Sequence, residues 1–365
     1  MIKEGKFGVQ EAISLMAITI SIKVYFTSPS VIAQILGTSG WFMTLISAAA
    51  ALVGFSFLYL LLKRFPGKDL IAVFDLALGR LFGFIFSMIL VLYLLTGTSI
   101  LIREFAEVLK VYSLPVTPTS FIIAALLCIT SSACFAGLEG IARSARVLVY
   151  YILCGFLIVI VLASINYDFH YLFPIFGNGF QRTVVYGLGR SSFYGEVILL
   201  GVIATSLQGV SHLKRAGVIS VILSAILVSA ALAASMMAFN YSTAQEITSQ
   251  MYELSRSIQL GSFLQRLDPL FLFTWCIGTV ISISFLQYCT LSTYCKAFRM
   301  QDMRPLILPV AIILFTGSMI PQELTTITEY VQITRQYGWI IYFGLPFVTL
   351  IIAVIRKKKE VPRSV

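Results

Sequence analysis

Ten apolar runs of about 20 residues each are the feature that most constrains this chain of 365 residues. A helix needs about 20 apolar residues to cross the hydrocarbon core of a bilayer. Backbone N–H and C=O groups inside lipid have no water partner, so each run is expected to be helical. We therefore predict an all-α membrane protein that forms a single bundle. The runs lie at about 11–36, 41–62, 81–109, 117–137, 141–164, 183–208, 216–239, 267–295, 304–322 and 338–355.

The composition excludes a water-soluble globule. Apolar residues make up 58% of the chain and charged residues only 12%, whereas soluble domains carry about 25% charged residues. The net charge is +10, but the basic residues lie in short clusters between apolar runs. That distribution is typical of cytoplasmic loops, so we predict a lipid bilayer and no nucleic acid as partner.

No catalytic or metal-binding pattern stands out in the sequence. The six cysteines all lie inside apolar runs, no CxxC pair is present, and the chain has two histidines. We find no zinc-protease, nucleophile-elbow or P-loop motif. We therefore predict neither an enzyme nor a metal site, and no cofactor.

The Lys and Arg residues predict the orientation of the bundle. Most of the 26 basic residues fall on one side when the N-terminus is placed in the cytoplasm. The even number of runs then leaves both termini cytoplasmic. On the cytoplasmic side, 68–80 has the apolar spacing of an in-plane helix. On the external side, 240–266 is the longest loop and has room for one or two short helices.

The first candidate site is a break inside the first run. Pro29 lacks a backbone donor and disfavours helix in the residue before it. Thr27 and Ser28 offer side-chain partners to the freed backbone groups, and Lys23 and Tyr25 lie just upstream. We predict an interrupted helix well inside the membrane, with these four residues as ligand-binding candidates.

The second candidate site is a glycine-rich stretch at 187–196 in the sixth run. It holds three glycines, two serines, the cation Arg190 and the anion Glu196. Charges inside a membrane are costly and by default mark a binding site or pathway. We therefore predict a second break near the bilayer centre. Its ligand-binding candidates are Ser191, Ser192, Phe193, Tyr194 and Glu196.

The two breaks occupy corresponding places if 11–164 and 183–355 are inverted repeats of five runs each. Such repeats bring two broken helices together at mid-depth, where half-helix ends bind charged groups of a substrate. A zwitterionic amino acid or another small polar nutrient suits that site. Two roles are open for Lys23. It either supplies a resident positive charge in place of a metal ion, with Glu196 as partner or proton acceptor, or it snorkels to the surface or bridges helices.

The third and eighth runs supply further candidates. Arg103 and Glu107 stand four residues apart and can pair on one helix face, as a structural clasp or as a gate. Gly97 and Thr98 belong to a small polar patch that serves either helix packing or a cavity wall. Trp275 lies about ten residues inside the eighth run and is expected to face the bundle.

Several short motifs follow one another in a characteristic order. They are the Pro29 break with Gly40-Trp41, the Arg103–Glu107–Lys110 spacing, GLEGIAR at 137–143, LFPIFGNG at 172–179, the turn from Phe193 to Glu196, FLQRLD at 263–268 with Trp275, Pro321, and the basic tail from Arg356. In this order the chain resembles the B subunit of spore germination nutrient receptors, a branch of the amino acid–polyamine–organocation transporter superfamily.

The resemblance implies a LeuT-like fold of ten helices in a five-plus-five inverted repeat. It also implies a location in the spore inner membrane and two partners, a membrane A subunit and a lipoprotein C subunit. A small germinant would bind around the two breaks. Carried over by position, the family's ligand contacts fall on Thr27, Ser28, Gly97, Thr98, Phe193 and Glu196.

The chain departs from the family pattern at both breaks. Ile22 and Val24 stand where many relatives have a glycine pair, and in the second break either the glycine, Gly195, is displaced or a residue is missing. Our interpretation is a germinant-binding receptor subunit. The alternatives are a secondary amino acid transporter, coupled to an ion or to protons, and an assembly scaffold without a ligand.

Overall fold

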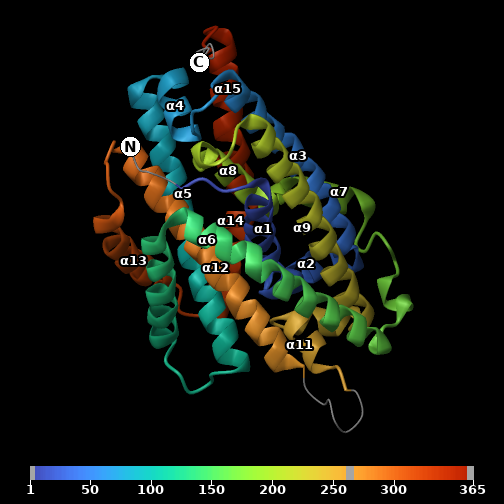
Figure 1. Cartoon of the computed structure of the whole chain (residues 1–365). Coiled ribbons are helices and arrows are strands. Elements are labelled where there is room, and N and C mark those ends of the chain that lie inside the picture. Colours follow the sequence, from blue (N-terminus) through green and yellow to red (C-terminus); the bar gives the residue numbers. More distant parts are fainter. Residues whose placement is uncertain (1–4, 260–266, 360–365) are drawn as a thin grey trace.

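The structure is a computed structural model that describes residues 5–259 and 267–359, and these residues form helices and short connections (Figure 1). The all-α membrane class is therefore confirmed. Six segments are long and apolar enough to cross a membrane, and the apolar helix α13 (Arg304–Met319) is shorter. The six segments are Ser28–Arg64, Arg80–Tyr112, Thr119–Asn166, Val210–Ala238, Asp268–Ala297 and Leu324–Ile355.

Helical residues cover each of the ten predicted runs, although the number of membrane crossings stays a prediction. The first half of the chain contains α1 (Val9–Ser21), η1 (Ile22–Tyr25), α2 (Ser28–Leu36), η2 (Gly37–Ser39), α3 (Gly40–Arg64), α4 (Leu70–Leu78), α5 (Arg80–Tyr112), α6 (Thr119–Ala163), η3 (Ser164–Asn166) and η4 (Phe169–Leu172). The second half contains α7 (Phe180–Gly189), η5 (Ser191–Ile198), α8 (Leu199–Val202), η6 (Ala204–Ser206), α9 (Val210–Ala238), α10 (Tyr241–Glu246), α11 (Gln250–Arg256), α12 (Asp268–Ala297), α13, α14 (Leu324–Trp339), η7 (Ile340–Gly344) and α15 (Leu345–Ile355).

A glycine joins the fourth and fifth runs without a loop. Both runs lie in α6, which is interrupted at Gly137 with φ 86° and ψ 173°. Figure 1 shows α6 changing direction where its two halves meet. Only glycine adopts this backbone conformation without strain, since it has no Cβ. The residue therefore allows two apolar runs to meet at an angle.

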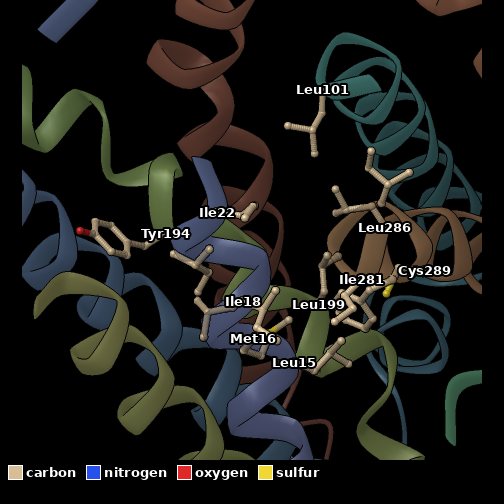
Figure 2. Close-up of a cluster of buried hydrophobic side chains, with 14 of the residues drawn as sticks. Leu15, Met16, Ile18, Ile22, Leu101, Tyr194, Leu199, Ile281, Leu286 and Cys289 are labelled. Carbon is tan, nitrogen blue, oxygen red and sulfur yellow. The ribbon is translucent and has the colours of Figure 1, made fainter. Parts of the chain in front are cut away.

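Helix α1 lies in the interior of the bundle (Figure 1). Eight of its thirteen residues are buried. A helix that is apolar and buried around most of its circumference belongs to a core rather than to a surface. Figure 2 shows Leu15, Met16 and Ile18 of α1 among buried side chains from α8 and α12. The break that follows α1 is consequently held inside protein.

The predicted peripheral segments are helical where the structure describes them. The segment at 68–80 contains α4, which begins after Asp69, whose side chain accepts a hydrogen bond from the Ala72 N–H at 2.8 Å. The loop at 240–266 contains two short helices, α10 and α11, as expected. Residues 260–266, with most of the FLQRLD motif, lie outside the described residues. The in-plane orientation of α4 and the external position of the loop stay predictions.

The predicted start of the last run is wrong. We placed it at 338, but the helical segment begins at Leu324 and runs through α14 and the π-helical turn η7 into α15. The buried positions of α14 are Ile327, Val331 and Gly338. These positions form only a narrow buried stripe on an otherwise polar helix. The sequence of α14 therefore has no continuous apolar run that would have predicted the helix. As a result, Arg335 lies in a helix and not in a loop.

Replacing Gly137 by Ala is expected to destabilise the protein by on the order of 1–3 kcal/mol, because the new Cβ disfavours the observed backbone conformation. The measurement is thermal unfolding of the purified protein in detergent. Gly344→Ala is the control, since Gly344 has helical φ −67° and ψ −42°. Equal melting temperatures for the two variants would contradict the conformational role of Gly137.

Candidate functional site

The first predicted break is present. Helix α1 ends at Ser21, a 3₁₀ turn follows, and Phe26 is extended with φ −96° and ψ −152°. Helix α2 then begins at Ser28, with Pro29 in its first turn. Proline suits this place because the first N–H groups of a helix have no intrahelical partner. Pro29 therefore starts the second half-helix.

The second predicted break is also present. Helix α7 ends at Gly189, and η5 continues as an eight-residue 3₁₀ segment, Ser191–Ile198, in which every residue is buried. Runs of 3₁₀ helix longer than about four residues are uncommon because their hydrogen bonds have poor geometry. Tertiary contacts must therefore hold η5 in place, and the strongest of these contacts come from charged side chains.

An ion cluster of three buried side chains joins the two breaks. The Nζ of Lys23 lies 2.6 Å from Oε2 of Glu196 and also donates to the backbone oxygen of Phe193. Nη1 of Arg335, on α14, lies 3.1 Å from Oε1 of Glu196. The side chains of Lys23, Glu196 and Arg335 are 3%, 5% and 13% exposed. The structure thus has Lys23 bridging two broken helices, and it does not snorkel to the surface.

The ring of Phe193 completes this ion cluster. It lies 4.6 Å from the Lys23 Nζ and 5.7 Å from the Arg335 Cζ. Desolvated cations are stabilised by the face of an aromatic ring. The hydroxyl of Ser192 donates to the backbone oxygen of Arg335, which fastens α14 to η5. Three elements, η1, η5 and α14, therefore meet at one set of charges.

A protein carboxylate occupies the N-terminus of the half-helix α2. Oε1 of Glu104, on α5, accepts hydrogen bonds from the Thr27 N–H at 3.0 Å and from the Thr27 hydroxyl at 2.5 Å. Thr27 is the residue that directly precedes α2. Helix N-termini attract negative charge, and here a protein carboxylate takes the place where a half-helix end could bind a charged group of a substrate. Glu104 is buried, and no described Lys or Arg pairs with it.

A small internal cavity lies between these charged groups. Its volume is about 30 Å³, which is room for about two water molecules. Among its walls, the hydroxyls of Thr98 and Ser282 are buried and have no partner in the described residues. The cavity is lined by Thr19, Lys23, Tyr93, Leu94, Gly97, Thr98, Ile100, Leu101, Glu104, Glu196, Ser282, Leu286, Val331, Thr334, Arg335 and Tyr342. Figure 2 shows two of its apolar walls, Leu101 and Leu286.

Seven of the predicted ligand-binding residues lie at or beside this cavity. Lys23, Gly97, Thr98 and Glu196 line it. Thr27 is bonded to a lining residue, Glu104, and Ser192 and Phe193 contact Arg335. These residues come from three elements, η1, α5 and η5, and from the connection before α2, and their role in ligand binding stays a prediction.

The other five predicted residues pack elsewhere. The ring of Tyr25 lies 5.0 Å from that of Phe271, and Trp275 packs against Phe26 at 5.3 Å. Figure 2 shows Tyr194 pointing away from α1. Neither Ser28 nor Ser191 lines the cavity, although both are buried at the breaks. The aromatic residues of this group therefore belong to the packed core around the breaks.

Twelve of the sixteen lining residues escaped our prediction of the site, among them the charged residues Glu104 and Arg335 and the unpartnered hydroxyl of Ser282. Arg335 was placed in an external loop because its helix is polar. Glu104 was visible as a charge inside an apolar run, but the Arg103–Glu107 spacing beside it suggested a pair that leaves Glu104 out. Ser282 lies in a run of alternating Ser and Ile residues, which offers no signal of a special position.

The predicted pair of Arg103 and Glu107 is confirmed, with 2.9 Å between Nη2 and Oε1. Arg103 also donates to the backbone oxygen of Gln322 at 3.2 Å, and Glu107 accepts from the Thr119 hydroxyl at 3.2 Å. The pair thus connects α5 with the start of α6 and with the segment after α13. These contacts are those of a clasp, and a gating role stays a prediction.

Comparison with known proteins places this architecture in a family. A family model described as spore germination protein matches residues 9–327. Spore germination protein KB of Bacillus subtilis is 24% identical over 337 residues, which cover 89% of each chain. Spore germination protein A2 of the same organism is 23% identical over 372 residues, which cover 97% of each chain.

The fold has a counterpart among solved structures. A Na⁺-coupled sialic acid symporter in a substrate-bound, outward-open state superimposes with a TM-score of 0.68 at 11% identity, covering 95% of this chain and 79% of the symporter. At that identity the likeness concerns the fold alone. Together, the charged break region and these comparisons show that the chain is a non-enzymatic integral membrane protein with a LeuT-like transporter fold, and that it belongs to the spore germination protein family.

Proposed function

We propose that the chain is the nutrient-sensing subunit of a germination receptor. A small polar germinant, such as an amino acid, would bind in the cavity between the two broken helices. One observation carries the proposal: Lys23, Glu104, Glu196 and Arg335, two cations and two carboxylates, line one buried cavity of a membrane protein. Charges at such a place are expensive and mark a functional site.

The charge arrangement fits a ligand with polar groups of both signs. Glu196 already pairs with both cations, whereas Glu104 has only Thr27 as partner among the described residues. Buried ion pairs contribute little net stability compared with well-packed apolar residues. Their presence at both breaks is therefore better explained by recognition of a ligand than by folding.

The size of the cavity implies that binding changes the structure. A volume of about 30 Å³ does not hold an amino acid, since ligand pockets measure about 300 Å³ or more. The ligand would therefore favour an expanded arrangement of η1, η5 and α14. A ligand shifts such a balance only through different affinities for the two states. The expanded state would be the signal to the membrane A subunit and the lipoprotein C subunit in the spore inner membrane.

Lys23 would supply a fixed positive charge between the broken helices. The symporter with the similar fold is named for its coupling to Na⁺. In this chain the ammonium group of Lys23 lies between the two breaks and is bonded to Glu196 and to the Phe193 oxygen. We propose that this group replaces a bound metal ion, so that nutrient sensing needs no sodium.

A secondary amino acid transporter is the second candidate, favoured by the likeness to a symporter fold. Uptake of labelled amino acids into proteoliposomes that contain the purified chain separates the two functions. Uptake above that of empty liposomes supports the transporter, whereas binding without uptake supports the receptor. In the scaffold alternative, neither binding nor uptake occurs.

Replacing Glu196 by Gln is expected to raise the nutrient concentration for half-maximal germination at least tenfold, about 1.4 kcal/mol, because Lys23 and Arg335 lose their shared counter-charge. The assay uses spores in which this receptor is the sole one, tested on single nutrients, with receptor abundance followed by immunoblot. Glu253→Gln is the matched control, since Glu253 pairs with the exposed Arg256. Unchanged nutrient specificity at normal abundance would favour the scaffold alternative.

Replacing Lys23 by Met is expected to weaken the nutrient response and to make the remaining response dependent on added sodium, because the resident cation is lost while Glu196 keeps Arg335. The same germination assay is run in sodium and in choline salts. Lys63→Met, which removes an exposed charge at the end of α3, is the control. If the variant depends on the nutrient in the same way as the unmodified receptor, Lys23 has no role in the binding site.

A further inference from the structure

Arg190 is a buried cation that lacks an acidic partner. The residue is 2% exposed, and its Nη1 donates to the Tyr186 hydroxyl at 2.5 Å. Its Nε and Nη2 have no hydrogen-bond partner among the described residues, and no described carboxylate pairs with it. A buried charge without a counter-charge destabilises a fold. A partner from outside the chain would explain why the guanidinium is retained.

Arg190 is one of the residues that line a second and larger pocket. This pocket, about 850 Å³ in volume, lies between α7 and the junction of α14 with η7, apart from the ion cluster. Arg182, Gln181 and Gln336 add further donors to its lining, which includes no acidic residue. A Cβ added at Gly189 would meet nothing within 4 Å, so the space beside Arg190 is open. The pocket is therefore cationic and rich in donors.

The rest of the lining is apolar and faces outward. Phe180, Val185, Tyr337 and Ile340 are each at least half exposed. Tyr337 and Ile340 belong to the apolar segment Leu324–Ile355, where exposed apolar surface is expected to face lipid. Trp339, which is 44% exposed, also lines the pocket, and Trp and Tyr are enriched where helices leave the hydrocarbon core. The pocket thus combines a cationic wall with an apolar rim that opens toward the bilayer.

We propose that this pocket binds the phosphate of an anionic phospholipid, with an acyl chain lying along the apolar rim. Nε and Nη2 of Arg190 are covered in this structure, so the guanidinium would turn toward the pocket to donate to two phosphate oxygens, whose geometry it matches with parallel hydrogen bonds. Arg182 adds a second positive charge. A zwitterionic lipid would bind more weakly, because its own cationic group meets this positive wall.

Occupancy would act on the elements that carry the ion cluster. Arg190 directly precedes η5, which holds Glu196, and Gln336 directly follows Arg335 on α14. A lipid between α7 and α14 would therefore stabilise the packing of η5 and α14, the two elements that meet at Glu196. The site would make the receptor sensitive to the composition of its membrane.

The test is native mass spectrometry of the full chain in detergent, with phosphatidylglycerol or phosphatidylcholine as probe. We expect the unmodified chain to retain phosphatidylglycerol about fivefold better than phosphatidylcholine. This is the effect of about 1 kcal/mol that one basic residue contributes. Arg190→Gln should abolish this preference, and the control Arg256→Gln, which removes one exposed charge, should keep it. Equal preference in Arg190→Gln and in the unmodified chain would overturn the proposal.

Thermal unfolding in detergent provides an independent measurement. Added phosphatidylglycerol should raise the melting temperature of the unmodified chain and leave that of Arg190→Gln unchanged. Without lipid, Arg190→Gln should melt no lower than the unmodified chain, because an unpaired buried charge is removed. A lower lipid-free melting temperature would overturn the proposal in favour of a structural role. Inorganic phosphate or acetate that stabilises as well as the lipid would overturn it in favour of a small-anion site.

Discussion

Backbone groups that leave a helix inside a membrane must find partners within the protein, and this constraint shapes the whole centre of the molecule. The Thr27 N–H donates to Glu104, and the Phe193 oxygen accepts from Lys23. Two charged side chains thus serve the unwound backbone. The same two side chains line the cavity, so the breaks and the proposed nutrient site share them.

The sequence predicted those parts of the site that depend on local signals. Pro29 and the glycine-rich stretch at 187–196 disrupt helices wherever they occur, so both breaks were visible, and the charges beside them suggested Lys23 with Glu196. Tertiary packing decided the rest. The helix of Arg335 buries only a narrow stripe, so its sequence has the polar character of a loop. Trp275 is a large buried side chain that packs against Phe26 and does not line the cavity.

Glycines permit close contacts at both breaks. The side chain of Ile22 lies against Gly278 of α12, where an added Cβ would overlap it. The glycine of α12 thus allows η1 to approach that helix. At the second break, Gly195 lies against the ring of Tyr342, a cavity wall.

The contact between Gly195 and Tyr342 also has an evolutionary consequence. Any side chain at 195 would collide with the ring, so a lineage can gain one there only after the aromatic residue at 342 has been replaced by a smaller one. The order of these two mutations is therefore fixed. Because Tyr342 borders the cavity, each such pair of changes would also reshape the wall of the chamber.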